Sequence, residues 1–286
     1  MSLADFGGGM RSACLALVPR CTVHNHAEVS TVTHDAFIHV PHLHGRLTPA
    51  DKSAMRITRE ALAIYDERAR KAGYPESWRH SDQKIEESWR SFFSYRTKPS
   101  DLWVYGYGSL MWDPGFHFTE VRLADVEGYQ RRFTLKTEIA RGSPEFPGLV
   151  LSLERKSGLC RGLAFRIAAD VAEAESEILW RREMITGGYC PAILSMRTPQ
   201  GSITGLAFTS NTSHPRYVGE LSLGETAAII ATGRGVIGTT RAYLEDMAAH
   251  LGALEIDDPY VERLVKEVNS IDVPILTSPE PKSIRS

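Results

Sequence analysis

Several features that would define a function class are missing from this chain of 286 residues. It has only four cysteines, none of them in C-x-x-C spacing, which argues against a zinc site, gives no disulfide framework and fits a reducing compartment. Lys plus Arg number 33 against 35 Asp plus Glu, so no positive excess favours nucleic acid or an anionic membrane as a partner. No apolar run approaches the ~20 residues that a membrane helix needs. The nucleotide loop G-x-x-x-x-G-K-[ST] is also absent.

The first 47 residues differ from the rest of the chain. No helical or strand period persists in them, and they hold six of the ten histidines. The pairs His24-x-His26 and His42-x-His44 can each bring two imidazoles to one metal ion, but no carboxylate or thiolate is arranged around these histidines. We therefore expect residues 1–54 to be a disordered, solvated extension. A metal-binding tract and a segment upstream of the natural start are the alternatives.

Two helices are expected before residue 100. The first is a periodic run from Thr48, which can cap it, to Lys71, with Gly73 as the stop. The second spans residues 81–95, where aromatic and aliphatic side chains share one face. These side chains are suited to packing, and we assign residues 55–100 to a helical segment that packs on the domain that follows.

Strands and helices then come in blocks and do not alternate. Strands are expected at residues 122–126, 131–139, 149–153, 159–167, 190–196 and 202–208. Helices are expected at residues 171–184, 222–232, 239–251 and 258–268. Clustered strands with inserted and appended helices indicate an α+β fold, not βαβ units. We take residues 101–272 as one domain and 273–286, which hold three prolines, as a disordered tail.

One stretch interrupts this pattern of strands and helices. The bulky segment L-W-V-Y at residues 102–105 is typical of a strand, and G-Y-G-S follows it directly. Glycine permits positive φ and close approach of a ligand to the main chain. A strand that runs into such a turn can direct successive N–H groups at one point, which makes a site for an anion or oxyanion. The candidate main-chain donors are Tyr107, Gly108, Ser109 and Leu110.

The longer string G-Y-G-S-L-M-W-D-P at residues 106–114 resembles a motif of the gamma-glutamylcyclotransferase fold, in the form found in its ChaC branch, the glutathione-specific gamma-glutamylcyclotransferases. The resemblance covers roughly residues 55–270. It continues through R-G-S-P-E-F-P-G at 141–148, C-R-G at 160–162, R-E at 182–183, G-G-Y at 187–189 and Y-V-G at 217–219. It implies a small mixed β-barrel with surrounding helices, and a cytoplasmic enzyme that cleaves glutathione to 5-oxoproline and cysteinylglycine. None of the matched motifs supplies a ligand set for a metal or nucleotide, so no cofactor is expected.

In such a reaction the substrate's own α-amine attacks its γ-carbonyl, so the enzyme mainly holds the bent conformer. It must also take a proton from the ammonium, stabilise the oxyanion and protonate the leaving amine. Glu183 is the candidate acid–base, because the resembled family has a glutamate at this motif position and burial raises a carboxyl pKa toward the useful range. Without the resemblance, a glutamate in R-R-E is usually a solvated charge at a helix end.

Three further residues are candidates for substrate contacts. Tyr189 can hydrogen-bond a substrate carboxylate or Glu183, or it is only a half-buried strand tyrosine. The Arg141 guanidinium can pair with the glycine carboxylate of glutathione, or it forms a surface ion pair. Ser109 is expected to position the substrate, because the G-x-S-x-G elbow of a serine nucleophile is absent. Tyr217 and His214 are weaker candidates.

Two function classes stay open. The first is an enzyme acting on glutathione or, as a close alternative, on other gamma-glutamyl peptides or amines. The second is a non-catalytic regulatory or binding protein on the same fold, which fits the older association of the family with cation transport. Glu183 together with the complete glycine loop favours the enzyme, because a binding protein needs no proton shuttle.

Overall fold

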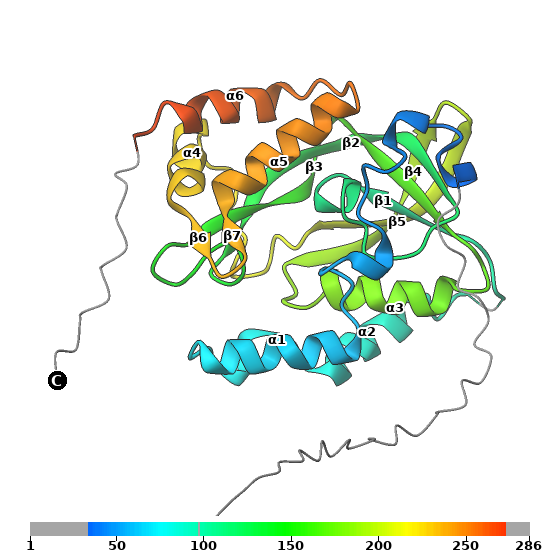
Figure 1. The fold of residues 1–286 in the computed structure, drawn as a ribbon, viewed down its shortest axis with the longest axis horizontal. Helices are drawn as coiled ribbons and strands as arrows, with labels where there is room; N and C mark the ends of the chain where they lie inside the picture. The colour runs from blue at the N-terminus through cyan, green and yellow to red at the C-terminus, as the bar shows by residue number, and fades with distance from the viewer. Residues whose placement is uncertain (1–33, 97, 273–286) are drawn as a thin grey trace, which may run out of the picture. The chain divides into compact units, whose positions relative to one another are not determined.

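A small closed barrel organises the part of the chain that the structure, a computed structural model, describes: residues 34–96 and 98–272 (Figure 1). Its strands follow the order β1-β3-β2-β4-β5, with a further contact between β3 and β5. Most pairings are antiparallel, but β5 meets β1 and β3 in parallel, so the barrel is mixed. The strands are β1 (Leu102–Gly106), β2 (Glu120–Thr137), β3 (Gly148–Ile167), β4 (Tyr189–Thr198) and β5 (Gly201–Ser210). The predicted α+β class is confirmed.

Strands β2 and β3 are longer than the sequence suggests. Each covers two segments that we expected to be separate strands, and the two pair with each other along most of their length. The register of β2 shifts between Glu127 and Tyr129, and Gly128 there has φ of 77°. A bulge bends a strand without ending it, so turn residues that look like a stop in the sequence become a bend in the barrel wall.

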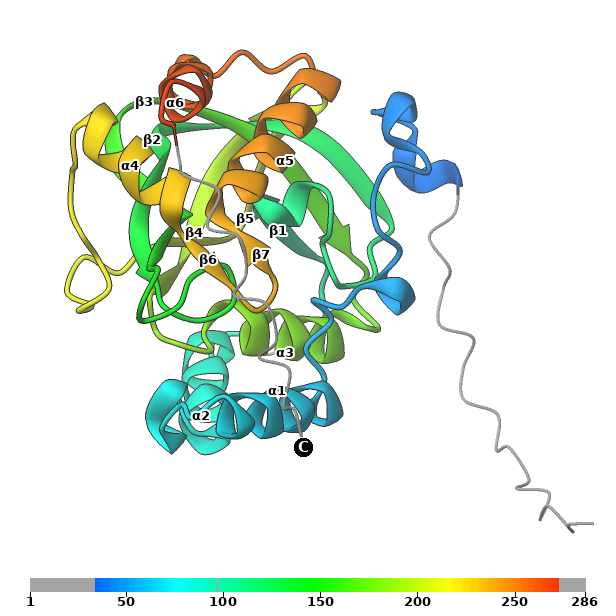
Figure 2. The same cartoon turned by 60° about the vertical axis from the view of Figure 1, so that its left-hand side comes forward.

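The helices lie in two groups on opposite sides of the barrel, as Figures 1 and 2 both show. One group is α1 (Arg59–Lys71), α2 (Asp82–Phe93) and α3 (Ala172–Glu183). The other is α4 (Leu223–Thr232), α5 (Thr240–Ala253) and α6 (Pro259–Asn269), with the hairpin β6 (Arg234–Gly235) and β7 (Gly238–Thr239) between α4 and α5. Five of these helices confirm the predicted ones to within two residues at each end. No helix in the described ranges is long and apolar enough to cross a membrane.

Helix α1 begins later than expected. The Thr58 hydroxyl accepts from the Ala61 N–H at 3.1 Å and caps the helix. Before it, Ala50–Lys52 forms only a 3₁₀ turn, and Ser53 is extended with its hydroxyl bonded to Asp113. The expected helix start at Thr48 is therefore wrong. The contact between Ser53 and Asp113 keeps the chain extended just before the Thr58 cap.

The expected disorder of residues 1–54 is wrong for residues 34–54, while residues 1–33 lie outside the described part of the chain. The ordered segment contains the 3₁₀ turns His34–Phe37 and Pro41–Leu43. It buries Phe37, Val40 and Leu43 in the main hydrophobic core. These apolar side chains follow neither a helical nor a strand period, so the sequence carries no periodic signal for their packing. The expected tail at 273–286 also lies outside the described residues.

Helix α2 anchors α3 through two reciprocal contacts. The Trp89 indole N–H donates to the Ser176 hydroxyl at 3.1 Å, and the Trp180 indole N–H donates to the Ser88 hydroxyl at 2.8 Å. Phe92 packs on Trp180 with ring centroids 5.1 Å apart. Each indole thus has its polar partner, and α2 and α3 are held against each other. All described residues fall in one compact unit, and the boundary at residue 100 stays a sequence-based proposal.

Candidate active site

A pocket lies where β1 ends in the glycine loop and α3 ends at Glu183. It encloses about 290 Å³ of empty space, counting its open mouth. Its walls come from six parts of the chain: Tyr107, Gly108, Ser109, Leu110, Leu151, Glu183, Tyr189, Phe208 and Tyr243. Six of the seven site residues suggested by the sequence therefore meet in one pocket, although they are spread over more than 75 positions of the chain.

The glycine loop presents main-chain donors to this pocket. Residues Ser109–Met111 form one 3₁₀ turn, whose first hydrogen bond runs from the Met111 N–H to the Gly108 carbonyl at 2.8 Å. The N–H groups of Ser109 and Leu110 precede that bond, so the turn itself gives them no carbonyl partner. The Ser109 main chain faces the Tyr243 hydroxyl closely enough to lower the pKa of that tyrosine, against the larger effect of burial. A substrate oxygen that displaced this hydroxyl would find the donors already oriented.

Gly108 suits this arrangement. A Cβ atom at this position would lie 3.1 Å from the Tyr243 hydroxyl oxygen. A side chain would therefore need Tyr243 to shift by a few tenths of an ångström. Glycine keeps the loop main chain accessible from the pocket.

Arg182 connects the glycine loop to the end of α3. Its Nη1 donates to the carbonyls of Asp113 at 2.6 Å and Pro114 at 3.1 Å, and its Nη2 donates to the Ser109 hydroxyl at 2.9 Å. Its Nε lies 3.1 Å from Glu183 Oε1. One buried guanidinium thus sets the distance between the loop and the glutamate. The Ser109 hydroxyl accepts from an arginine and has no histidine bonded to it among the described residues, which agrees with a positioning role.

Glu183 is the carboxylate of the pocket. Its side chain is 13% exposed, and its one polar contact among the described residues is with Arg182. Burial raises the pKa of Glu183 above the ordinary value of 4.5, and the nearby Arg182 charge opposes this only in part. A buried carboxyl with a raised pKa and free lone pairs can take and return a proton.

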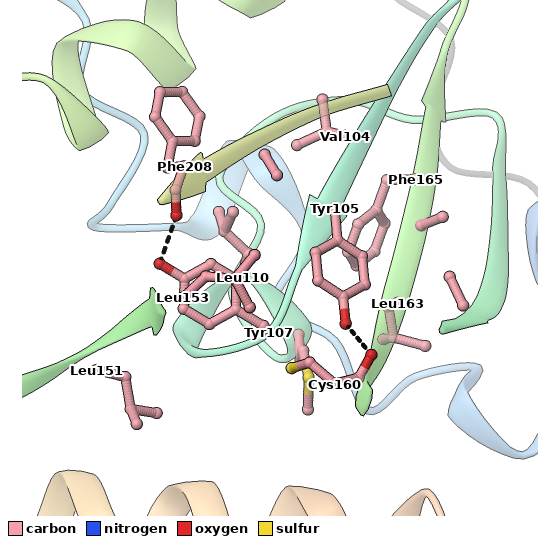
Figure 3. Close-up of a cluster of buried hydrophobic side chains, with 14 of the residues drawn as sticks. Val104, Tyr105, Tyr107, Leu110, Leu151, Leu153, Cys160, Leu163, Phe165 and Phe208 are labelled. Carbon is pink, nitrogen blue, oxygen red and sulfur yellow. Dashed lines mark hydrogen bonds between the residues drawn. The ribbon is translucent and has the colours of Figure 1, made fainter. Parts of the chain in front are cut away.

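Three tyrosines surround Glu183. The hydroxyls of Tyr107 and Tyr189 donate to the main-chain carbonyls of Phe208 and Leu151, each at 2.8 Å (Figure 3 shows the first of these bonds). Burial raises the pKa of both well above the ordinary value, and the charge of Glu183 adds to this effect. Burial also raises the pKa of Tyr243 to about 12. The three phenols therefore stay protonated, and Tyr107 and Tyr189 use their one O–H each in these main-chain bonds.

Arg141 is the one proposed site residue that does not line the pocket. Its Nη1 donates to the Thr239 carbonyl at 3.2 Å, and its Nη2 lies 3.6 Å from Asp246 Oδ2. The guanidinium sits over the ring of Tyr243, 5.1 Å from the centroid. Arg141 thus contacts Tyr243, which lines the pocket, but does not line the pocket itself. The weaker candidate Tyr217 bonds instead to Glu154, at 3.1 Å.

Sequence reasoning missed Leu151, Phe208, Tyr243 and the role of Arg182. Leu151 and Phe208 look like ordinary core residues of strands, and burial alone does not mark them as pocket walls. Tyr243 lies inside a helix with no motif around it. The motif R-E contains Arg182, but its bonds to a loop 70 positions earlier cannot be read from the pair.

The histidine-rich N-terminus offers no metal centre within the described residues. No group of three His, Cys, Asp or Glu side chains is placed there to hold a metal ion. His39 lies 3.2 Å from Glu120, and His44 packs edge-on against Phe37. Residues such as His24 and His26 lie outside the described ranges.

Comparison with known proteins supports the family resemblance that the sequence motifs indicate. A family profile described as "ChaC-like protein" matches residues 102–271. The glutathione-specific gamma-glutamylcyclotransferase of Escherichia coli (strain K12) is 31% identical over 216 residues, which cover 75% of this chain and 93% of that protein. The protein of the same name from Schizosaccharomyces pombe is 34% identical over 188 residues, covering 58% of this chain and 92% of that one.

A solved structure supports the fold. The crystal structure of a glutathione-specific gamma-glutamylcyclotransferase from yeast matches with a TM-score of 0.56 and 23% sequence identity. The match covers 60% of this chain and 96% of that one. This likeness confirms the predicted barrel with its surrounding helices.

Proposed function

Because the chain belongs to the ChaC-like protein family, we propose that it is an enzyme that cleaves glutathione to 5-oxoproline and cysteinylglycine, with Glu183 as general acid–base. The observation that carries the proposal is the placement of Glu183. It is a buried carboxylate with a raised pKa and a single polar neighbour, in the same pocket as the N–H groups of the glycine loop. A protein that only binds a ligand has no need for this costly arrangement.

In the first step Glu183 takes a proton from the substrate α-ammonium. The freed amine nitrogen attacks the γ-carbonyl carbon and closes the five-membered ring, which makes the carbonyl oxygen an oxyanion. The N–H groups of Gly108, Ser109 and Leu110 are the donors we assign to this oxyanion or to the substrate α-carboxylate. The protonated Glu183 then gives its proton to the cysteine nitrogen as the C–N bond breaks. The ring nitrogen still carries a surplus proton, which the Glu183 carboxylate takes up and passes to the released amine, so cysteinylglycine leaves as an ammonium and the carboxylate is restored.

The remaining pocket residues bind the substrate in this proposal. Tyr107 and Tyr189 flank Glu183 and shape the space for the gamma-glutamyl group. Arg141 stays a candidate for the glycine carboxylate from the sequence, and in the structure it supports Tyr243 from outside. We also propose a cytoplasmic location, because glutathione is the main thiol of that reducing compartment.

Mass spectrometry of the purified protein tests the proposal. The protein is incubated in parallel with glutathione and with gamma-glutamyl-alanine, and 5-oxoproline is quantified. We expect 5-oxoproline and cysteinylglycine in equimolar amounts from glutathione and little product from the second compound. Equal turnover of both would favour the broader substrate range, and no product from either would leave the non-catalytic function.

A further inference from the structure

The loop from Asn211 to Tyr217 follows β5 and lies beside the pocket. Its Asn211 N–H donates to the Gly188 carbonyl at 3.0 Å, and the Asn211 side-chain amide donates to the Gly187 carbonyl at 2.9 Å. At its other end the Arg216 carbonyl accepts from the Lys136 N–H at 2.8 Å. The loop is thus fixed between the Gly-Gly turn that follows Glu183 and the end of β2.

Arg216 projects from this loop without a carboxylate partner. Its Nε donates to the Lys136 carbonyl at 2.6 Å. In the described part of the chain no carboxylate oxygen lies within 4.0 Å of its guanidinium, and neither Nη has a protein hydrogen bond. Arg182 and Arg141 differ, because each has an acidic neighbour, Glu183 at 3.1 Å and Asp246 at 3.6 Å respectively.

The electrostatics show that the Arg216 charge is not compensated. The side chain is half-buried, and this burial lowers the pKa of Arg216. The strongest opposing influences are Tyr189 and then Glu138, and Glu138 is already paired with Lys136 at 2.6 Å. A half-buried cation that lacks a counter-ion is stabilised by binding an anion.

Arg216 lies beside the pocket wall formed by Tyr189. Its charge acts on the Tyr189 hydroxyl, and Tyr189 lines the pocket next to Glu183. Leu135, the neighbour of Lys136 on β2, packs against Gly188. Arg216 is therefore outside the small space around Glu183 but adjacent to it, on the Gly188–Tyr189 side.

From this placement we infer that Arg216 binds the carboxylate at the far end of a gamma-glutamyl substrate, which is the glycine carboxylate in glutathione. The inference rests on the proposed function. The gamma-glutamyl group fills the pocket at Glu183 and the glycine loop, so the far carboxylate must lie beyond the pocket mouth. A planar guanidinium with two free Nη groups matches a carboxylate in a bidentate pair.

The test compares glutathione with its glycyl ethyl ester, which lacks the far negative charge. Steady-state kinetics are measured on wild type, Arg216→Gln and Arg216→Lys. We expect wild type to prefer glutathione by roughly 10- to 100-fold in kcat/KM, the range of a charge-assisted hydrogen-bonded pair. Arg216→Gln should lose this preference through a higher KM with little change in kcat, because Glu183 is untouched. Arg216→Lys should recover part of it.

Two further arginine variants make the result specific. Arg155→Gln removes an exposed arginine on β3 and should keep the full preference. Arg141→Gln decides between the two candidate arginines. Loss of the preference in Arg141→Gln but not in Arg216→Gln would assign the far carboxylate to Arg141 and overturn the inference. An Arg216→Gln protein that is folded by circular dichroism and still prefers glutathione also overturns it. A wild-type protein that makes no 5-oxoproline from either compound overturns the proposed function together with the inference.

Discussion

Helix α3 carries a buried glutamate at each end, and the two have different surroundings. Glu175, in the first turn, is 4% exposed and accepts from Arg56 Nη1 at 2.6 Å, Arg56 Nη2 at 2.9 Å and the His117 N–H at 3.1 Å. Glu183, eight positions later at the last turn, is 13% exposed and, among the described residues, meets only the Arg182 Nε. A carboxylate that accepts several hydrogen bonds at both oxygens stabilises the fold, whereas one that is buried and incompletely paired is available for chemistry.

The Glu175 end also connects the N-terminal segment to the site. Arg56, which pairs with Glu175, donates in addition to the Gly115 carbonyl at 3.2 Å. The Ser53 hydroxyl donates to Asp113 at 2.5 Å, and the Thr48 N–H donates to the Trp112 carbonyl at 2.8 Å. The residues that follow the glycine loop are thus held from one side by the chain before α1 and from the other by Arg182.

The largest effect is expected on turnover when Glu183 is changed. Glu183→Gln keeps the size of the side chain but removes its ability to accept a proton, so kcat should fall by about 10²–10⁴-fold with KM nearly unchanged. The matched control is Glu177→Gln on the same helix, where the carboxylate is about one-third exposed and bonds to Arg181. Retention of more than a tenth of wild-type turnover in Glu183→Gln would show that the proton acceptor lies elsewhere.

Changing Glu175 to Gln should lower the free energy of unfolding. Glu175→Gln leaves Arg56, which is 19% exposed, without its counter-ion, and removing one partner of a buried pair costs about 3–5 kcal/mol. Denaturant unfolding measures this loss. The kcat of the folded fraction should stay within a few-fold of wild type, because Glu175 does not line the pocket. A variant with wild-type stability and greatly reduced kcat would reverse the assignment of roles along α3.

A smaller effect is expected for Ser109→Ala. The hydroxyl holds one N–H of Arg182, and its loss costs roughly one charge-assisted hydrogen bond, or about tenfold in kcat/KM. The main-chain donors of the loop remain. The kcat/KM of Ser109→Ala should therefore be well above that of Glu183→Gln. A larger loss in Ser109→Ala than in Glu183→Gln would point to a direct role of the serine in the reaction.

The smallest effect is a dependence of stability on pH. Since the folded-state pKa of Glu183 is raised, the folded protein binds more protons than the unfolded chain above the ordinary value of 4.5, and wild-type stability falls as pH rises through this window. The neutral side chain of Glu183→Gln avoids this cost. Its Tm should exceed that of wild type near pH 8, and the difference should shrink toward pH 4.5. A Tm difference between Glu183→Gln and wild type that stays constant with pH, or that grows on acidification, would contradict a raised pKa of Glu183.

The elements of this fold follow from local signals in the sequence. Ser81 and Ser222 cap α2 and α4 through their side chains, the latter in a capping box with Glu225, and such caps need only neighbouring residues. The strand before Gly106 and the turn after it are equally local. The same kind of signal marks the glycine loop, and the resemblance of its motif to a known family is enough to single out Glu183.

Closure of the barrel decided the rest, because it joins residues that are far apart in the chain. It packs α5 over the loop, which brings Tyr243 to the Ser109 main chain, and it directs Arg182 to the carbonyls beyond that loop. It also gives the aperiodic segment around Phe37 a surface to bury against. The sequence alone determined which residue types could do the chemistry. Only tertiary packing decided which arginines are already paired and that Arg216 has no carboxylate partner among the described residues, since long-range neighbours set the burial and charge of each group.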